Sequence, residues 1–388
     1  MSLTFDSARI ANPHFTESHH AWREQLRRFI DAEIMPFADE WDETGSIPAA
    51  LWPKAAAVGL LGLGYPESYG GTPADSWYQW IMNEELARIG AGGIPASLMV
   101  HGIGLPPVLN WGSDALKAEV APPVLAGEGW ISLGITEPDA GSDVANLRTT
   151  AVRDGDDFIV TGSKTYITGG MRANWISTAV RTGGPGASGV SMLLIPTDLP
   201  GFSRTPLKRK MGWWASDTAT LYFDQVRVPA RYLIGEENQG FRVIMTNFNG
   251  ERMAMAASME AFARVCLEEA VQWAATRQTF GQRLADHQVI RHKIASMKQK
   301  LNATQAYIRC CYEAIEAGAP NAGDIALLKV QASEVMEYCA REAMQILGGA
   351  GYMRGHRVER IYREVRVNAI GGGSEEVMRD LASRQYGL

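Results

Sequence analysis

Residues Asp154 to Gly170 read DGDDFIVTGSKTYITGG, and this stretch decides the fold class. Between two turn-forming ends it is rich in β-branched and aromatic residues, which favour a pleated strand over a helix. Segments of the same kind recur on both sides of it, namely ISLGIT (131–136), NWISTAV (174–180), VSMLLIP (190–196) and TLYFDQVRV (220–228). The middle of the chain is therefore predicted to be a β domain.

Helical patterns flank this β stretch on both sides. Amphipathic or helix-forming segments precede and follow it, at 22–41, 50–61, 76–89, 241–277, 288–317 and 323–347. Pro36 lies inside the first of them and should kink or end that helix. The order α, β, α predicts an α+β protein with a helical domain at 1–129, a β domain at 130–240 and a helical bundle at 241–388.

Composition places the chain among globular proteins. It has 388 residues, of which 46% are hydrophobic and 21% are charged, with a net charge of −6. An acidic chain gains no broad electrostatic attraction to nucleic acid, so that class of partner is disfavoured. The N-terminus lacks a signal-peptide pattern and no apolar run is long enough to span a bilayer, so a cytoplasmic protein is expected.

Several familiar catalytic and binding motifs are absent. No GxGxxG follows a predicted strand, and there is no GxxxxGK[ST], HExxH or GxSxG. Dinucleotide-binding Rossmann, P-loop, zinc-protease and serine-hydrolase sites are therefore not supported, and no metal is expected. The cysteines have no CxxC spacing and are interpreted as buried thiols in a reducing compartment: Cys266, Cys310, Cys311 and Cys339. The basic run at 208–210 is interpreted as a solvated turn.

Nine stretches together carry a resemblance to a known family. They are GLLGLGYPESYGG (59–71), EELARIG (84–90), ITEPDAGSDVANL (135–147), GSKTYITGG (162–170), KMGWWASDTATLYFDQVRVP (210–229), LIGEENQGF (233–241), TRQTFGQRLADHQVI (276–290), QILGGAGYMR (345–354) and IGGGSEEVMR (370–379). In this order they resemble the acyl-CoA dehydrogenases. The resemblance covers nearly the whole chain and implies the family's architecture: an N-terminal helical domain, a central β-barrel or sandwich and a C-terminal four-helix bundle.

The resemblance implies an FAD-dependent oxidation in fatty-acid metabolism. A base removes the proton next to the thioester carbonyl of an acyl-CoA, and a hydride leaves the β-carbon for the flavin. Electrons then pass to an electron-transfer flavoprotein. The protein must hold flavin, thioester and carboxylate in one dry slot.

The implied flavin contacts lie in three parts of the chain. In the β stretch, the residues that match ring contacts are Leu133, Ile135, Thr136, Tyr166, Ile167 and Thr168, and Ser142 matches a ligand shared with the CoA arm. In the helical part, the residues that match contacts to the FAD of a neighbouring subunit are Arg277, Thr279, Phe280, His287, Gln288, Gln345, Gly348 and Gly349. Ser374 and Glu376 match a flavin-contacting turn. An arginine suits pyrophosphate because it donates paired hydrogen bonds, and the sharing implies a homo-oligomer, expected to be a tetramer.

Two positions compete for the catalytic base. Most straight-chain relatives carry a glutamate where this chain has Gly372, and glycine cannot act as a base. A minority, including the isovaleryl-CoA and long-chain enzymes, carries Glu-Arg on the first helix of the C-terminal domain, which matches Glu251 and Arg252. The straight-chain glutamate is missing at Gly372, and a glutamate is present at the other position. Together these two facts indicate Glu251 as the base. Glu375 and Glu376 fit helix-start acids after a Ser374 cap.

Helical spacing supports Glu251 as the base. Phe248, Glu251 and Met255 fall on one helix face, so the carboxylate lies among apolar groups and its pKa is expected to rise. The competing interpretation is a surface glutamate paired with a nearby basic residue.

The resemblance also implies substrate contacts, at Ser142, Phe248, Asn249, Arg252 and Gly372. In Gly372 the backbone N–H would polarise the thioester carbonyl. The base position favours a branched, medium or long acyl chain. Two alternatives stay open: an acyl-CoA oxidase that uses O2, and a non-catalytic relative that binds acyl-CoA or nucleic acid.

Overall fold

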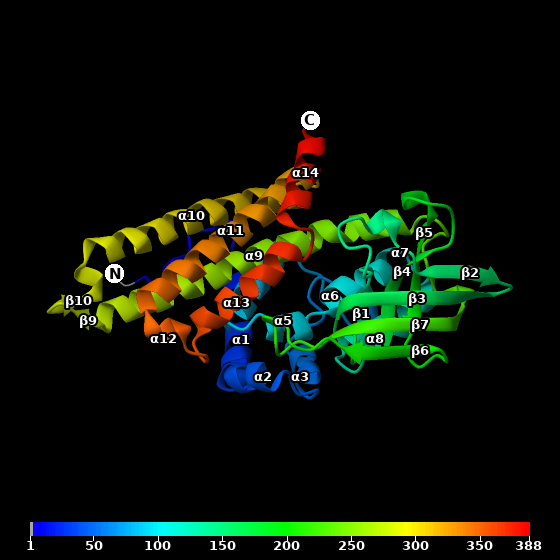
Figure 1. The fold of residues 1–388 in the computed structure, drawn as a ribbon, viewed down its shortest axis with the longest axis horizontal. Helices are drawn as coiled ribbons and strands as arrows, with labels where there is room; N and C mark the ends of the chain where they lie inside the picture. The colour runs from blue at the N-terminus through cyan, green and yellow to red at the C-terminus, as the bar shows by residue number, and fades with distance from the viewer. Residues whose placement is uncertain (1–2) are drawn as a thin grey trace. The chain divides into compact units, whose positions relative to one another are not determined.

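The computed structural model describes residues 3–388 and divides into two compact units. The helical unit comprises 1–40, 74–92 and 252–388, and the sheet unit comprises 41–73 and 93–251. The long helix α9 (Gly240–Thr276) contributes residues to both, with the change between Glu251 and Arg252. Figure 1 shows the elements in chain order.

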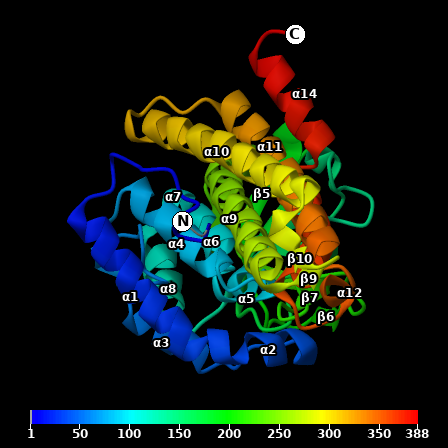
Figure 2. The same ribbon diagram turned by 90° about the vertical axis from the view of Figure 1, so that its left-hand side faces the viewer.

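Long helices build the helical unit. They are α1 (Glu17–Glu33), α4 (Ser76–Ala87), the second part of α9, α10 (Gln288–Glu316), α11 (Ala322–Leu347), α13 (Arg357–Ile370) and α14 (Glu375–Gln385). The shorter elements are η1 (Met35–Phe37), α12 (Gly349–Tyr352), η6 (Leu284–Asp286) and the two-stranded hairpin of β9 (Gln278–Thr279) and β10 (Gln282–Arg283). In both views α10 and α11 lie side by side (Figure 1 and Figure 2).

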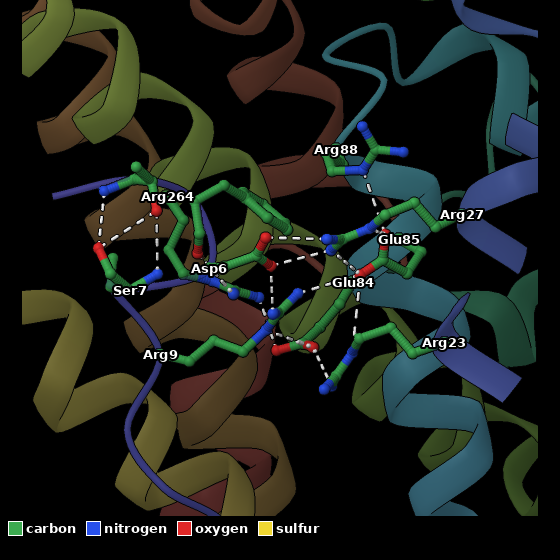
Figure 3. A network of polar contacts seen from close by, with 12 residues as sticks. Asp6, Ser7, Arg9, Arg23, Arg27, Glu84, Glu85, Arg88 and Arg264 are labelled. Carbon is green, nitrogen blue, oxygen red and sulfur yellow. Dashed lines mark hydrogen bonds and ion pairs between the residues drawn. The ribbon is translucent and has the colours of Figure 1, made fainter. Parts of the chain in front are cut away.

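An apolar core and a buried ion network hold this unit together. Met259, Cys266 and Leu328 belong to one fully buried cluster along α9 and α11. Figure 3 shows the network, in which Glu84 of α4 accepts hydrogen bonds from Arg23 (2.9 Å) and Arg264 (2.6 Å). Buried charges need such pairing because they have lost their hydration.

One eight-stranded sheet builds the other unit. Its strands are β1 (Ile131–Gly134), β2 (Thr150–Asp154), β3 (Asp157–Thr168), β4 (Trp175–Arg181), β5 (Val190–Pro196), β6 (Phe202–Pro206), β7 (Thr218–Pro229) and β8 (Leu233–Ile234). The order is β6-β7-β3-β2-β4-β5-β8, and β1 pairs in parallel with β4. Strand β7 alternates buried and exposed side chains, as expected for a sheet with one solvated face.

Short helices cover the apolar face of the sheet. They are α3 (Leu51–Ala57), α5 (Gly93–Leu98), α6 (His101–Gly104), α7 (Pro106–Trp111) and α8 (Asp114–Leu125), while α2 (Ala38–Thr44) spans the boundary between the units. Leu105, Val120 and Ile176 are among the buried residues of their shared core. Among residues 3–388, none of the helices has both the length and the apolar character needed to cross a membrane.

Most predicted elements are confirmed, and several details are corrected. The three late helices end within two residues of their predicted bounds, and Pro36 does end α1 before a short 3-10 turn. Helices α5 to α8, which contain glycine or proline, and the five-residue strands β2 and β6 were not predicted. Cys310 is exposed, unlike the other three cysteines. In the basic run, Lys208 and Arg209 are exposed as predicted, whereas Lys210 is half-buried and its Nζ donates to Trp213 O at 2.8 Å.

Candidate active site

An irregularity in strand β3 lies among the predicted flavin contacts of the sheet unit. Lys164 pairs with Leu221 of β7, and Ile167 pairs with Ala219, so β3 has one residue more than its partner between these points. The extra residue bends the strand, and Tyr166 takes a φ of 59° with 69% of its surface exposed. Such bulges re-aim side chains and are common beside active sites.

The segment after β1 lies directly beside this bulge. The backbone N–H of Thr165 donates to Thr136 O at 2.9 Å. This bond brings the predicted ring contacts of β1 (Leu133, Ile135 and Thr136) next to those of β3 (Tyr166, Ile167 and Thr168). Thr136 and Thr168 are half-buried, whereas Ile135 and Ile167 are buried and support the surface from below.

This surface fits the flavin that the resemblance implies. It offers a flat exposed aromatic ring, two half-buried hydroxyl groups and nearby backbone, which suit one polar edge and the apolar face of a ring system. Ser142 is exposed on the loop that follows Glu137. A Cβ built on the neighbouring Gly141 would meet no atom within 4 Å. That loop has room for a phosphate or an extended ligand arm.

A charged pair lies beneath the same surface. Lys164 has no exposed area, and its Nζ donates to Glu137 Oε1 at 2.8 Å and to Ile135 O at 3.0 Å. Burial lowers the pKa of Lys164 to about 8, although Glu137 opposes that shift. The pKa of Glu137 is lowered despite its burial, since it accepts hydrogen bonds from Lys164 and from the Arg148 and Thr149 amides.

The predicted substrate contact Gly372 lies in a glycine turn of the helical unit. Gly372 and Gly373 have φ values of 67° and 109°, which explains why glycine occupies both positions. Arg252 Nε donates to Gly372 O at 3.1 Å, and the buried Lys329 donates to Ala369 O at 2.9 Å and Gly373 O at 2.8 Å. Two buried cations from α9 and α11 therefore fix the path of this turn.

Helix α9 presents one face to the glycine turn. Besides Arg252, the Cε of Met255 reaches this turn, at 3.8 Å from where a Cβ on Gly371 would lie. Glu251 precedes Arg252 and lies one helical turn before Met255. Glu251, Phe248 and Asn249 are half-buried, and Arg252 is 6% exposed.

Beyond the turn, Ser374 caps α14. Its side chain accepts from the Val377 amide, as predicted. Glu375 Oε1 accepts a hydrogen bond from Ser333 at 2.7 Å. Glu376 is exposed, and hydrogen bonds from its own backbone amide and from Ser374 lower its pKa. Both acids thus behave as helix-start residues.

The remaining predicted FAD residues lie at another end of the helical unit. Arg277 and Phe280 are exposed on the β9–β10 hairpin, and Thr279 Oγ1 lies 3.0 Å from His287 Nε2, with Gln288 beginning α10. Gln345, Gly348 and Gly349 lie where α11 ends. Within residues 3–388, no hydrogen bond joins these groups to the Gly372 turn. Gln345 follows Lys329 by 16 residues, which is about 24 Å along the helix.

Sequence analysis missed Lys164, Glu137 and Lys329. A lysine inside an apolar strand or helix was the available signal, because charged residues at core positions are almost always paired. Their partners, however, are distant in sequence or are backbone carbonyls, so the sequence alone could not name them.

Comparisons with known proteins agree along the whole chain. Models of the N-terminal, middle and C-terminal domains of acyl-CoA dehydrogenase match residues 16–128, 132–226 and 238–387. An acyl-CoA dehydrogenase of Alternaria alternata is 38% identical, over 97% of this chain and 93% of its own. The long-chain specific mitochondrial acyl-CoA dehydrogenase of Rattus norvegicus is 33% identical, over 96% of this chain and 87% of its own.

Solved structures give the same result. A probable acyl-CoA dehydrogenase from Mycobacterium abscessus superposes with a TM-score of 0.94 at 44% identity, covering 96% of this chain and 99% of its own. A glutaryl-CoA dehydrogenase from Mycobacterium smegmatis in complex with FADH2 reaches 0.90 at 26% identity, covering 96% and 95%. This chain therefore belongs to the acyl-CoA dehydrogenase family, whose members are FAD-dependent oxidoreductases.

Proposed function

We propose that this protein oxidises an acyl-CoA thioester to the 2-enoyl-CoA, with FAD held by the segments above and Glu251 as the base. One observation carries the assignment of the base. Arg252 and Met255, which follow Glu251 by one and four residues on its helix, both reach the glycine turn that lacks a carboxylate. A carboxylate on α9 could thus act at the position where other members carry their glutamate.

Each group has a distinct part in the proposed reaction. The Glu251 carboxylate accepts the proton from the α-carbon, and the β-hydrogen leaves with its electron pair as the double bond forms. FAD, when bound, supplies the acceptor for that hydride. Thr136 and Thr168 offer hydroxyls to its polar edge, and Tyr166 covers it.

The Gly372 turn polarises the thioester. Its amide N–H donates to the carbonyl oxygen, which gains negative charge as the proton leaves. Because Arg252 and Lys329 hold the carbonyls of this turn, the amide is fixed before substrate binds, so no reorganisation is needed in the transition state.

Substrate range, electron acceptor and assembly complete the proposal. The base on α9 favours a branched, medium or long acyl chain, and so does the absence of side-chain bulk in the Gly371–Gly373 run. An electron-transfer flavoprotein takes the electrons, in the cytoplasm. The Arg277 and Gln345 groups bind the FAD of another subunit in a tetramer, and the distance along α11 from Gln345 to Lys329, which holds the Gly372 turn, supports this.

Anaerobic flavin bleaching with a panel of acyl-CoA thioesters tests the activity. Purified protein should hold FAD without a covalent bond and lose its absorbance with branched, medium or long chains. A colourless protein that does not bind added FAD would contradict the proposed function. Rapid reoxidation of the reduced enzyme in air would instead favour an oxidase.

Glu251→Gln tests the base. The amide keeps the size but cannot accept the proton, so flavin reduction should slow by at least about a thousandfold while FAD and acyl-CoA still bind. Stopped-flow absorbance and binding titrations measure the two effects. Glu337→Gln is the matched control, since it removes an exposed carboxylate of α11 that has no part in the proposed site and should reduce flavin at the wild-type rate.

Relocation of the carboxylate gives a stricter form of this test. Glu251→Gly combined with Gly372→Glu copies the straight-chain arrangement and should recover part of the lost rate. Full recovery is not expected, because a displacement of about 1 Å can cost a hundredfold. Reduction of the Glu251→Gln flavin at the wild-type rate would overturn the assignment and make Glu375 or Glu376 the next candidate for the base.

A further inference from the structure

We propose that Lys164 and Glu137 are positioning residues that set the flavin surface, and this inference rests on the proposed function. Both side chains lie beneath that surface and belong to its own strands and turn. Neither has a part in the reaction described above. The pair is therefore placed to control where the ring contacts lie without touching substrate.

Lys164 joins the two segments that form the flavin surface. It begins the β3 bulge, two residues before Tyr166, and its Nζ reaches Ile135 O at 3.0 Å across to the segment after β1. The next residue repeats the link, since Thr165 N donates to Thr136 O. Side-chain and backbone bonds thus fix the spacing between Ile135–Thr136 and Tyr166–Thr168.

Glu137 anchors the other side of this link. Its Oε1 accepts from Lys164 Nζ at 2.8 Å and from Thr149 N at 2.9 Å, and its Oε2 accepts from Arg148 N at 2.6 Å. The carboxylate thereby ties the turn after Thr136 to the start of β2. The bonds from Lys164 and Thr149 lie in the interior, where charge-assisted hydrogen bonds are strong, and the bond from Arg148 is partly buried.

Because the pair is buried, a role in stability alone would not explain why these two residues are charged. Lys164 is 0% exposed and Glu137 is 5% exposed, and such pairs are often no more stabilising than apolar residues of similar size. Both partners must nevertheless stay in place, because an unpaired charge in the interior would cost free energy. The pair therefore specifies one arrangement of the bulge where apolar packing would allow several.

Removal of one partner should alter the flavin itself. In Lys164→Met the Ile135 carbonyl loses its donor, and in Glu137→Gln the lysine loses its counter-charge. Apoprotein of each variant is titrated with FAD, and the visible spectrum and reduction potential of the bound flavin are measured. We expect FAD affinity to fall at least about tenfold, and the affinity for oxidised relative to reduced flavin to change about tenfold, equal to about 30 mV for a two-electron couple.

Two controls separate positioning from general stability. Tyr232→Phe removes the bond from Tyr232 Oη to Glu119 at 2.7 Å in the same unit, so it should lower the unfolding midpoint and leave the potential unchanged. The double variant Lys164→Met/Glu137→Gln leaves no unpaired charge and should regain stability, but not the wild-type potential. If Lys164→Met fails to fold, the same measurements are made on Glu137→Gln, in which the new side chain keeps the shape of glutamate.

The outcomes distinguish this inference from the proposed function. Variants that lose stability but keep the wild-type spectrum, FAD affinity and potential would assign the pair a structural role only and overturn the inference. Wild-type protein that does not bind FAD would overturn the proposed function instead. Wild-type protein that binds FAD, with single variants shifted and Tyr232→Phe unshifted, supports both.

Discussion

At the scale of single residues, two neighbouring buried carboxyl groups have pKa shifts of opposite sign. Glu84 lies among Arg264, Arg9 and Arg23, which hold its pKa below the usual range although burial opposes them. Glu260 is equally buried, but it has one arginine partner, Arg264, and lies near the charge of Glu84. Burial therefore dominates and raises the pKa of Glu260 to about 7.

Glu260 gives a pH dependence with a distinctive sign. Between its ordinary pKa of 4.5 and about 7, the folded state keeps a proton that the unfolded state has lost. The contribution of Glu260 to the free energy of unfolding is thus complete below pH 4.5. It is lost as the pH rises towards 7, by up to about 1.4 kcal/mol per pH unit. Glu260→Gln stays neutral, so its stability relative to wild type should increase across this window.

Unfolding midpoints of the two proteins from pH 4.5 to 7.5 measure this effect. The surrounding charges are common to both proteins, namely Arg264, Glu84 and Arg9, with Lys298 and Cys339 also near Glu260. Comparison of the two therefore isolates Glu260. A constant difference over the whole range would contradict the raised pKa.

At the scale of elements, the turn between α13 and α14 depends on a single lysine of α11. Lys329 has no exposed area and donates to the carbonyls of Ala369, at the end of α13, and Gly373, just before α14. A cation suits this place because carbonyls at a helix C-terminus lack intrahelical partners. The same turn carries Gly372, so stability and the proposed carbonyl contact are linked there.

Lys329→Met should destabilise this unit and loosen the turn. The methionine keeps most of the length but leaves two inward carbonyls without this donor, at a cost of about 2–4 kcal/mol. Denaturant unfolding measures the loss, and Lys208→Met, at an exposed lysine, is the control. A wild-type midpoint for Lys329→Met would show that other contacts fix the turn.

At the scale of the whole molecule, the shared cofactor site makes assembly testable. Arg277→Glu places a negative charge where we propose FAD pyrophosphate, and Glu251→Gln removes the base. If each site takes Arg277 from one subunit and Glu251 from another, co-expressed variants should regain about a quarter of the sites, because half of the random pairs hold one intact site.

Light scattering and flavin reduction of the co-expressed protein measure assembly and recovery. Arg283→Glu is the matched control, since Arg283 is exposed on the same hairpin and pairs with Asp286 at 2.8 Å. It should leave FAD bound. A monomer with full FAD, or no recovery on co-expression, would contradict the shared site.

The sequence by itself determined the fold class, the long helices and most strands. Period-two and helical patterns are local, and segments such as 288–317 are long enough for propensity to decide them. The order of quoted motifs determined the family, and the proposal of Glu251 as the base rests on matching Glu251 and Gly372 to the two base positions of that family.

Only the tertiary structure decided what supports the site. The bulge at Tyr166 depends on one extra residue relative to β7, and a register shift has no local signal in β3. Lys164 meets the Ile135 carbonyl 29 residues away, and Lys329 meets the Gly373 carbonyl 44 residues away. Backbone carbonyls are present at every residue, so no side-chain pattern identifies which of them a buried cation will bind.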